Sequence, residues 1–188
     1  SEIAHAPEDM VIFTKPSTSV IGPDDPIVYP VCSKDMNFEP EVAVVMGRIA
    51  KNVTVENAMD YVLGFTCVND VTLRDLQGID PTWTRAKGFD TSCPLGPWIV
   101  MRDDLDWRDA KISFTLNGED VPMASGTTAN LIHGIPEQIA AISSFSTLLP
   151  GDVIMTGTPN ASGHLDPGDE TIVHVEGIGD LRNVVVRA

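Results

Sequence analysis

Two glutamates at the head of an apolar strand constrain this chain more than any other feature. Glu39 and Glu41 lie two residues apart in the segment Asn37–Gly47 (NFEPEVAVVMG), which is otherwise almost entirely apolar. Alternation along a strand puts both side chains on one face with Cα atoms about 6.6 Å apart, so that they can converge on one cation. Two such anions beside a core strand repel each other and resist desolvation unless a positive charge compensates. A bound metal is the simplest compensation, and a Glu-x-Glu at the solvent end of a strand is the alternative.

Three further residues extend this hypothesis. Asp70 closes a second apolar segment and is a candidate third ligand, although a lone aspartate there is also typical of a helix cap or a turn. Lys87 lies among small residues rather than on a charged helical face. Its ammonium group is a candidate for polarising a carbonyl or stabilising an enolate, and a surface lysine is the alternative. Thr158, in a Gly-Thr-Pro turn, is either a turn residue or a group that holds a substrate carboxylate.

Composition narrows the class of protein. With 188 residues and 43% hydrophobic content, the chain is expected to fold as one domain around one core. Its net charge of −15 argues against nucleic acid and anionic membrane surfaces as partners. No apolar stretch approaches the roughly 18 residues of a membrane helix, and the first residues are unlike a secretion signal, so a cytoplasmic protein is expected.

The cysteine and histidine residues are not spaced as ligands of a soft metal ion. Cys32, Cys67 and Cys93 are widely spaced and fit reduced, partly buried thiols. The four histidines form no cluster with one another or with cysteine. Any metal should therefore be oxygen-bound, which favours Mg²⁺ with Mn²⁺ as a substitute.

Short β-type runs dominate and predict a mixed α/β chain that is mainly β. Asn117-Gly118, after an alternating run, indicates a hairpin turn. Leu149–Asp152 predicts a turn into a buried strand. The expected helices are Val55–Tyr61 behind a Thr54 cap, a short turn near Leu73–Gln77, and Pro136–Phe145. The expected strands are Val11–Thr14, Pro26–Tyr29, Glu41–Met46, Val62–Val68, Trp98–Met101, Ile112–Leu116, Val153–Thr156, Thr171–Val175 and Val184–Val186.

Four segments in order resemble the fumarylacetoacetate hydrolase family. They are Phe38–Gly47, Asn69–Gln77, Ala86–Pro94 and Gly151–Pro159, and the resemblance runs from about Val11 to the C-terminus. It implies a β-sandwich roll with a few short helices, usually dimeric, that holds Mg²⁺ or Mn²⁺ through Glu39, Glu41 and Asp70. It also implies that Lys87 contacts the reacting oxo group, that Arg74 and Gln77 line the pocket, and that Thr158 binds the substrate carboxylate.

Members of that family hydrolyse acylpyruvates and related diketo acids, decarboxylate oxaloacetate, or isomerise hydroxydienedioates. The resemblance therefore implies a divalent-metal-dependent hydrolase or lyase that cleaves a C–C bond in a small 2-oxo or 2,4-dioxo acid through a metal-stabilised enolate. One alternative is an isomerase or tautomerase of a 2-hydroxydienedioate, and another is a catalytically silent homologue that only binds an oxo acid. The expected partners are the 2-oxo acid and a second copy of the chain in a homodimer.

The chain departs from the family pattern in two places. Family members commonly carry an N-terminal lid segment whose His/Glu dyad activates water, and His5 does not match the lid histidine in context. Residues 1–188 are accordingly expected to form a single catalytic domain that lacks the lid. Such a domain would be less impaired in decarboxylation than in hydrolysis. Residues 160–163 (NASG) also replace the usual Gly-Val-Gly after the Gly-Thr-Pro turn.

Overall fold

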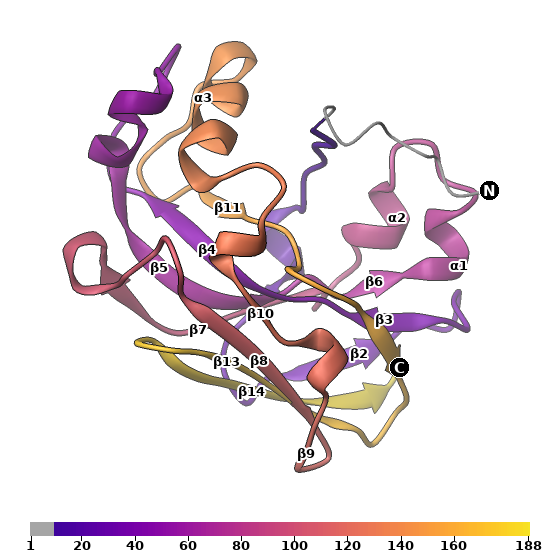
Figure 1. Cartoon of the computed structure of the whole chain (residues 1–188). Coiled ribbons are helices and arrows are strands. Elements are labelled where there is room, and N and C mark those ends of the chain that lie inside the picture. Colours follow the sequence, from indigo (N-terminus) through magenta and orange to yellow (C-terminus); the bar gives the residue numbers. More distant parts are fainter. Residues whose placement is uncertain (1–9) are drawn as a thin grey trace.

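Two β-sheets that share one apolar core dominate the computed structural model, which describes residues 10–188 (Figure 1). The first sheet has five strands in the order β1-β7-β5-β4-β11. Its neighbours are antiparallel except for the parallel pair β1 and β7. Its strands are β1 Val20–Ile21, β4 Pro40–Met46, β5 Val62–Asn69, β7 Cys93–Met101 and β11 Val153–Met155.

The second sheet follows the order β10-β8-β13-β14-β2, and β9 pairs with β8. The β8–β9 hairpin turns at Asn117 and Gly118, whose φ angles of 54° and 82° confirm the predicted turn. The strands of this sheet are β2 Pro26–Tyr29, β8 Lys111–Leu116, β9 Glu119–Asp120, β10 Gly126–Thr127, β13 Glu170–Val175 and β14 Gly179–Arg187.

A third, smaller sheet joins β12, β3 and β6, and short helices surround the strands. In Figure 1 the two helices α1 and α2 lie together on one side of the molecule, and α3 lies at its upper end. Within residues 10–188, none of the helices has the length and apolar character needed to span a membrane. These elements are β3 Met36–Phe38, β6 Thr72–Leu73, β12 Gly163–Leu165, α1 Arg74–Gln77, α2 Thr84–Lys87, α3 Ile135–Phe145, and the 3₁₀ helices η1 Ser17–Ser19, η2 Val55–Tyr61, η3 Arg102–Asp104, η4 Pro122–Ala124 and η5 Thr128–Asn130.

Strand β4 is buried along its whole length and has two different faces. Val42, Val44 and Met46 belong to the main core between the sheets, as alternation along a strand requires. Ala43 belongs to a separate small cluster with residues of β5 and the start of β7. Since Glu41 shares the face of Ala43, its carboxylate points away from the main core.

The predicted mixed, mainly β architecture is confirmed, but several local predictions are wrong. Residues 11–14 form no strand, and all but Phe13 of them are exposed. The segment Val55–Tyr61 is a 3₁₀ helix rather than an α-helix, and the Thr54 side chain makes no capping hydrogen bond. Cys32 is exposed, whereas the other two cysteines are buried as expected. His5 and the start of the chain, on which the prediction about the lid partly rests, lie outside the described residues.

Candidate metal centre

Strand pairing brings the three predicted ligands together. Glu41 is the second residue of β4, and Glu39 lies between β3 and β4. The antiparallel register of β4 and β5 sets Pro40 opposite Asn69, so Asp70 falls beside Glu39. Two hydrogen bonds of 2.9 Å fix this corner: the Asp70 amide donates to the Glu39 carbonyl, and the Glu39 amide donates to Oδ1 of Asn69.

The carboxylates of Glu39, Glu41 and Asp70 each offer an oxygen, and these oxygens lie within 4.8 Å of one another. Glu41 and Asp70 are each 2% exposed, so both anions are removed from water. A cluster of carboxylate oxygens with no sulfur or imidazole donor suits a hard divalent cation such as Mg²⁺ or Mn²⁺. The predicted ligand set therefore has both the proximity and the donor chemistry that a divalent cation requires.

Lys87, at the end of α2, places its ammonium group inside this cluster. Its Nζ lies 2.5 Å from Oε2 of Glu39 and 2.6 Å from Oδ2 of Asp70, and the side chain is 4% exposed. Burial opposes the charged form, but the carboxylates of Asp70 and Glu39 outweigh it and raise the pKa of Lys87. Lys87 is therefore charged, and the prediction that it points inward is confirmed.

A second lysine in contact with the cluster escaped the sequence analysis. The Nζ of Lys15 lies 2.6 Å from Oδ1 of Asp70 and donates to the Val71 carbonyl at 3.3 Å. Burial raises the pKa of Asp70, but the two ammonium groups of Lys15 and Lys87 more than compensate, so that this pKa is lowered. A lone lysine in an irregular, mostly exposed segment gives no local signal of this contact.

Glu41 has the least compensated charge of the three carboxylates. Burial, followed by the negative charges of Asp70 and Glu39, raises the pKa of Glu41 well above its usual value. Lys87 and a hydrogen bond of 2.8 Å from the Gly157 amide to Oε2 act in the opposite direction without outweighing burial. A divalent cation would supply the positive charge that Glu41 lacks.

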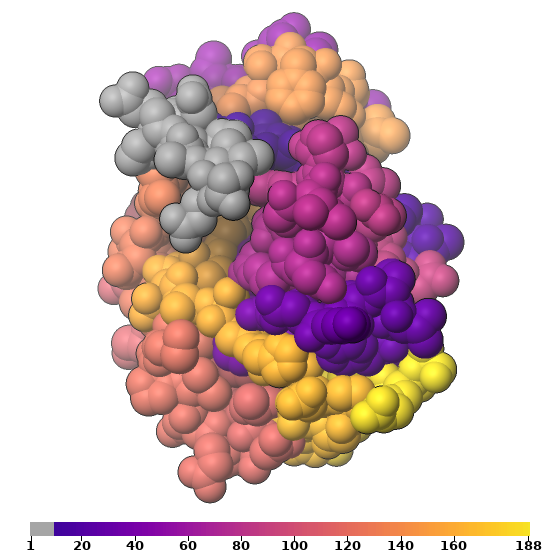
Figure 2. Space-filling view, turned by 90° about the vertical axis from the view of Figure 1, so that its right-hand side faces the viewer, coloured from indigo at the N-terminus to yellow at the C-terminus, as the bar shows by residue number. Residues whose placement is uncertain are grey.

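Arg74 closes one side of the cluster. Its Nη2 donates to Oε1 of Glu39 and, at 2.6 Å, to Oγ of Ser162, while Nη1 donates to Oε1 of Gln77 at 2.7 Å. The predicted pocket residues Arg74 and Gln77 therefore touch each other at the edge of the site. Ser162, which sequence reasoning did not identify, belongs to the segment that departs from the family pattern. Figure 2 shows this face, where the segment of α1 and α2 (magenta) lies beside the loop after β11 (orange).

Thr158 lies against the strand that carries the two glutamates. Its hydroxyl donates to the Pro40 carbonyl at 3.0 Å, so this hydroxyl fastens the turn after β11 to the start of β4. Thr156, at the beginning of the same turn, donates to the Val42 carbonyl at 2.8 Å. The turn is thus held beside the cluster, and the binding of a substrate carboxylate by Thr158 stays a prediction.

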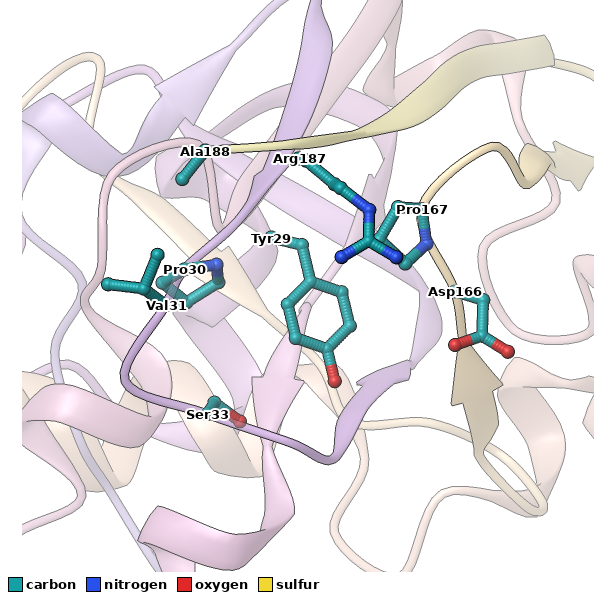
Figure 3. A pocket seen from close by; sticks show the side chains of 8 residues that line it. All are labelled: Tyr29, Pro30, Val31, Ser33, Asp166, Pro167, Arg187 and Ala188. Carbon is teal, nitrogen blue, oxygen red and sulfur yellow. The ribbon is translucent and has the colours of Figure 1, made fainter.

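A surface depression of about 410 Å³ lies elsewhere, around the ring of Tyr29 (Figure 3). Ser33, Asp166 and Arg187 supply charged or polar groups to its lining. With one acidic side chain and one guanidinium group, this lining lacks the group of carboxylates that a hard cation requires. The candidate metal site is therefore the carboxylate cluster rather than this hollow.

The fold and the site together define a β-rich protein with a buried cluster of three carboxylates, whose oxygens are the donors that a hard divalent cation prefers. Residues 1–186 match the family described as "Fumarylacetoacetate (FAA) hydrolase C-terminal". The chain therefore belongs to the fumarylacetoacetate hydrolase family, as its motifs predicted.

Three relatives of this chain are named for different reactions. The sequence of 5-carboxymethyl-2-hydroxymuconate delta-isomerase from Mycobacterium smegmatis is 47% identical to this chain. Its crystal structure matches with a TM-score of 0.92 and covers 97% of this chain and 72% of that one. Oxaloacetate tautomerase FAHD2A, mitochondrial, from Homo sapiens is 40% identical over 96% of this chain and 60% of its own length. Fumarylpyruvate hydrolase from Pseudomonas aeruginosa, in complex with Mn²⁺ and pyruvate, is 28% identical, with a TM-score of 0.87 over 94% of this chain and 78% of that one.

Proposed function

We propose that this protein is a divalent-metal-dependent enzyme that acts on a small 2-oxo acid through its enolate. The observation that carries the proposal is the buried cluster of Glu39, Glu41 and Asp70, with the Lys87 ammonium group between two of its members. When bound, Mg²⁺ or Mn²⁺ would hold the 2-oxo carboxylate and act as a Lewis acid toward the enolate charge. The Mn²⁺ complex of the Pseudomonas relative supports this choice of ion.

The side chains around the cluster have separate tasks in this proposal. Lys87, held in its charged form, would stabilise negative charge on the reacting oxygen and donate the proton that the enolate takes up. Arg74, held at the edge by Gln77 and Ser162, would pair with a further carboxylate of the substrate. Because the Thr158 hydroxyl already donates to Pro40, the backbone amide of Thr158 would contribute to carboxylate binding.

Proton transfer between keto and enol forms is the reaction that the relatives support best. The relatives at 40% and 47% identity are named as a tautomerase and an isomerase. Both reactions require stabilisation of an enolate and a proton donor, which the metal-bound cluster and the Lys87 ammonium group would supply in this proposal. Cleavage of a C–C bond, by hydrolysis or decarboxylation, is the second candidate, which the fumarylpyruvate hydrolase at 28% identity favours.

Product analysis of two substrates tests the proposal. The purified chain would be incubated with oxaloacetate and with an acylpyruvate, in Mg²⁺ or in excess chelator. At rates above those with Mg²⁺ alone, loss of enol absorbance without release of a fragment indicates proton transfer, and release of pyruvate indicates cleavage. If neither substrate changes in a metal-dependent way, the proposal fails and the alternative of a catalytically silent homologue is favoured.

The homodimer and the cytoplasmic location stay predictions. Light scattering after size-exclusion chromatography measures the first: a mass near twice the 20.2 kDa of the chain is expected. A monomer at micromolar concentration would contradict it. Fractionation of the source cells with an antibody against the chain measures the second.

A further inference from the structure

Two lysines hold opposite oxygens of the same buried carboxylate. Lys15 contacts Oδ1 of Asp70 and Lys87 contacts Oδ2, each at 2.6 Å. The two lysine side chains are each 4% exposed and that of Asp70 is 3% exposed, so all three groups are shielded from water. The lysines arrive from different parts of the chain, one from the segment before η1 and the other from the end of α2.

The second contact of each ammonium group distinguishes the two lysines. Lys87 also contacts Glu39, at 2.5 Å, so it bridges two of the three candidate ligands. Lys15 instead donates to the Val71 carbonyl at 3.3 Å, outside the ligand set. The Lys87 ammonium therefore stands between an oxygen of Glu39 and an oxygen of Asp70, whereas Lys15 contacts the other oxygen of Asp70.

The position of Lys87 sets it in competition with an ion that would bind the same oxygens of Glu39 and Asp70. Among the described side chains, the ammonium groups of Lys15 and Lys87 and the Arg74 guanidinium group form ion pairs with two of the three carboxylates, those of Glu39 and Asp70. A divalent ion that binds the same oxygens would repel an ammonium group held between them. Lys15 on Oδ1 leaves Oδ2 available, so it does not compete for the same oxygen.

Phe13 offers the Lys87 ammonium group a second favourable contact. The Lys87 Nζ lies 4.9 Å from the centroid of the Phe13 ring, within the range of a cation–π interaction. This ring in turn packs edge-on against Trp83, with the centroids 5.7 Å apart. Phe13 is two residues from Lys15, so one segment both anchors Asp70 and supplies the aromatic face for Lys87.

We propose that the Lys87 ammonium group is a displaceable counter-ion that leaves the ligand oxygens when a divalent ion binds, whereas Lys15 is a positioning residue that stays on Asp70. This inference rests on the proposed function only in assuming that a divalent ion binds the cluster. Lys87 pairs with the carboxylates of Glu39 and Asp70 in the structure. The Phe13 ring, which already lies 4.9 Å from the Lys87 Nζ, would stay beside the ammonium group after displacement. Lys15 keeps Oδ2 of Asp70 directed at the cluster throughout.

Nuclear magnetic resonance of the lysine side chains tests the proposal directly. Buried, ion-paired ammonium groups would be observed in the purified chain labelled with ¹⁵N-lysine, and the two signals would be assigned with Lys87→Met and Lys15→Arg. On titration with diamagnetic Mg²⁺, the Lys87 signal is expected to shift or broaden in step with binding, and the Lys15 signal to keep its position. A shift of Lys15 with Lys87 unmoved, or unmoved signals at an Mg²⁺ occupancy established by calorimetry, overturns the inference.

Binding of Mn²⁺ to a matched pair of variants gives an independent measure. Lys87→Met removes a competitor and is expected to bind Mn²⁺ about tenfold more tightly than the wild type. Lys15→Met removes one charge from the same carboxylate but also its anchor, so no tightening is expected. An equal gain in Mn²⁺ affinity in both variants would mean that only the loss of positive charge matters. This result would overturn the distinction between Lys87 and Lys15. Lys51→Met, at an exposed lysine bonded to the Ser144 carbonyl, is the control and should not differ from the wild type.

If calorimetry detects no binding of Mg²⁺ or Mn²⁺ at millimolar concentration, both this inference and the proposed function are wrong. If the ion binds but the Lys15 signal moves and the Lys87 signal does not, this inference alone is wrong. The two failures are therefore distinguishable without measuring turnover.

Discussion

The backbone amide of Gly157 donates a hydrogen bond of 2.8 Å to Oε2 of Glu41. This contact joins the turn after β11 to the most deeply buried glutamate of the cluster, across 116 positions of sequence. Gly157 has a φ of +100°, a conformation that side chains with a Cβ rarely adopt. The glycine therefore lets the chain turn and aim its amide at the carboxylate.

Replacement of Gly157 by alanine should damage both stability and metal binding. Forcing a Cβ residue into this backbone conformation is expected to cost about 1–3 kcal/mol of unfolding free energy, measured by denaturant unfolding. A shifted turn also loses the hydrogen bond to Glu41, so Mn²⁺ affinity should fall.

Gly118→Ala is the matched control for this substitution. Gly118 has a φ of +82° and lies in the β8–β9 hairpin. A Cβ at Gly118 would have open space, and a Cβ at Gly157 would meet only Leu131, at 4.0 Å. Neither variant therefore introduces a close contact. The control should lose comparable stability and keep its Mn²⁺ affinity, and equal loss of affinity in both variants would contradict the role of Gly157.

The buried Glu41 predicts an unusual dependence of stability on pH. Burial and the charges of Asp70 and Glu39 raise the pKa of Glu41 above that of the unfolded chain. Its stabilising contribution is therefore fully present below the pKa of the unfolded chain and is lost as pH rises through the higher pKa of the folded protein.

In excess chelator, Glu41→Gln should therefore become more stable relative to the wild type as pH rises from about 4 to about 8, because glutamine resembles the protonated acid. Unfolding by urea at each pH measures this, with Glu119→Gln in the exposed β9 as the control. In the wild type, Mg²⁺ affinity should rise over the same range, since the ion binds the ionised carboxylate. A stability difference between Glu41→Gln and the wild type that is independent of pH would contradict the assignment.

The candidate ligands were predictable because local sequence determines their placement. Alternation in Glu39-Pro40-Glu41, with an apolar strand after it, is enough to predict two carboxylates on one side of a strand. The order of the four motifs then supported Asp70 as the third ligand and Lys87 as the residue that contacts the substrate. The structure adds that Glu39 precedes β4 rather than belonging to it, so the convergence of the two side chains also depends on the chain path between β3 and β4.

The residues that sequence reasoning missed are placed by contacts across the fold. Lys15 meets Asp70 across 55 positions and Ser162 meets Arg74 across 88 positions. Neither residue lies in a periodic element, so no hydrophobic pattern reports its orientation. The strand predicted at residues 11–14 was wrong for the same reason, since a short apolar run does not reveal whether a partner strand is available.

Ser162 predicts an effect on substrate binding rather than on turnover. Its hydroxyl accepts a hydrogen bond of 2.6 Å from Arg74, a guanidinium group that is 28% exposed. A hydrogen bond to a charged group contributes about 1.5–3 kcal/mol, which partial exposure reduces to about 1 kcal/mol here.

Ser162→Ala should accordingly raise KM roughly fivefold for a dicarboxylate substrate and change kcat less than roughly twofold. Steady-state kinetics in saturating Mg²⁺ would measure both constants. Ser144→Ala, at an exposed serine bonded to its own helix, should change neither. A fall in kcat at constant KM would indicate that Arg74 acts in the chemical step instead.

Removal of Asp70 should unfold part of the population as well as abolish metal binding, because two buried ammonium groups depend on it. Asp70→Ala leaves Lys15 without a carboxylate partner among the described residues, while Lys87 keeps its contact with Glu39. Breaking one side of a buried ion pair costs about 3–5 kcal/mol, so the free energy of unfolding should fall by this amount. Adding Lys15→Met to Asp70→Ala removes the stranded charge and should recover more than about half of the loss. Urea unfolding of the two single variants and the double variant measures the coupling, and additive losses would mean that Lys15 and Asp70 do not stabilise each other.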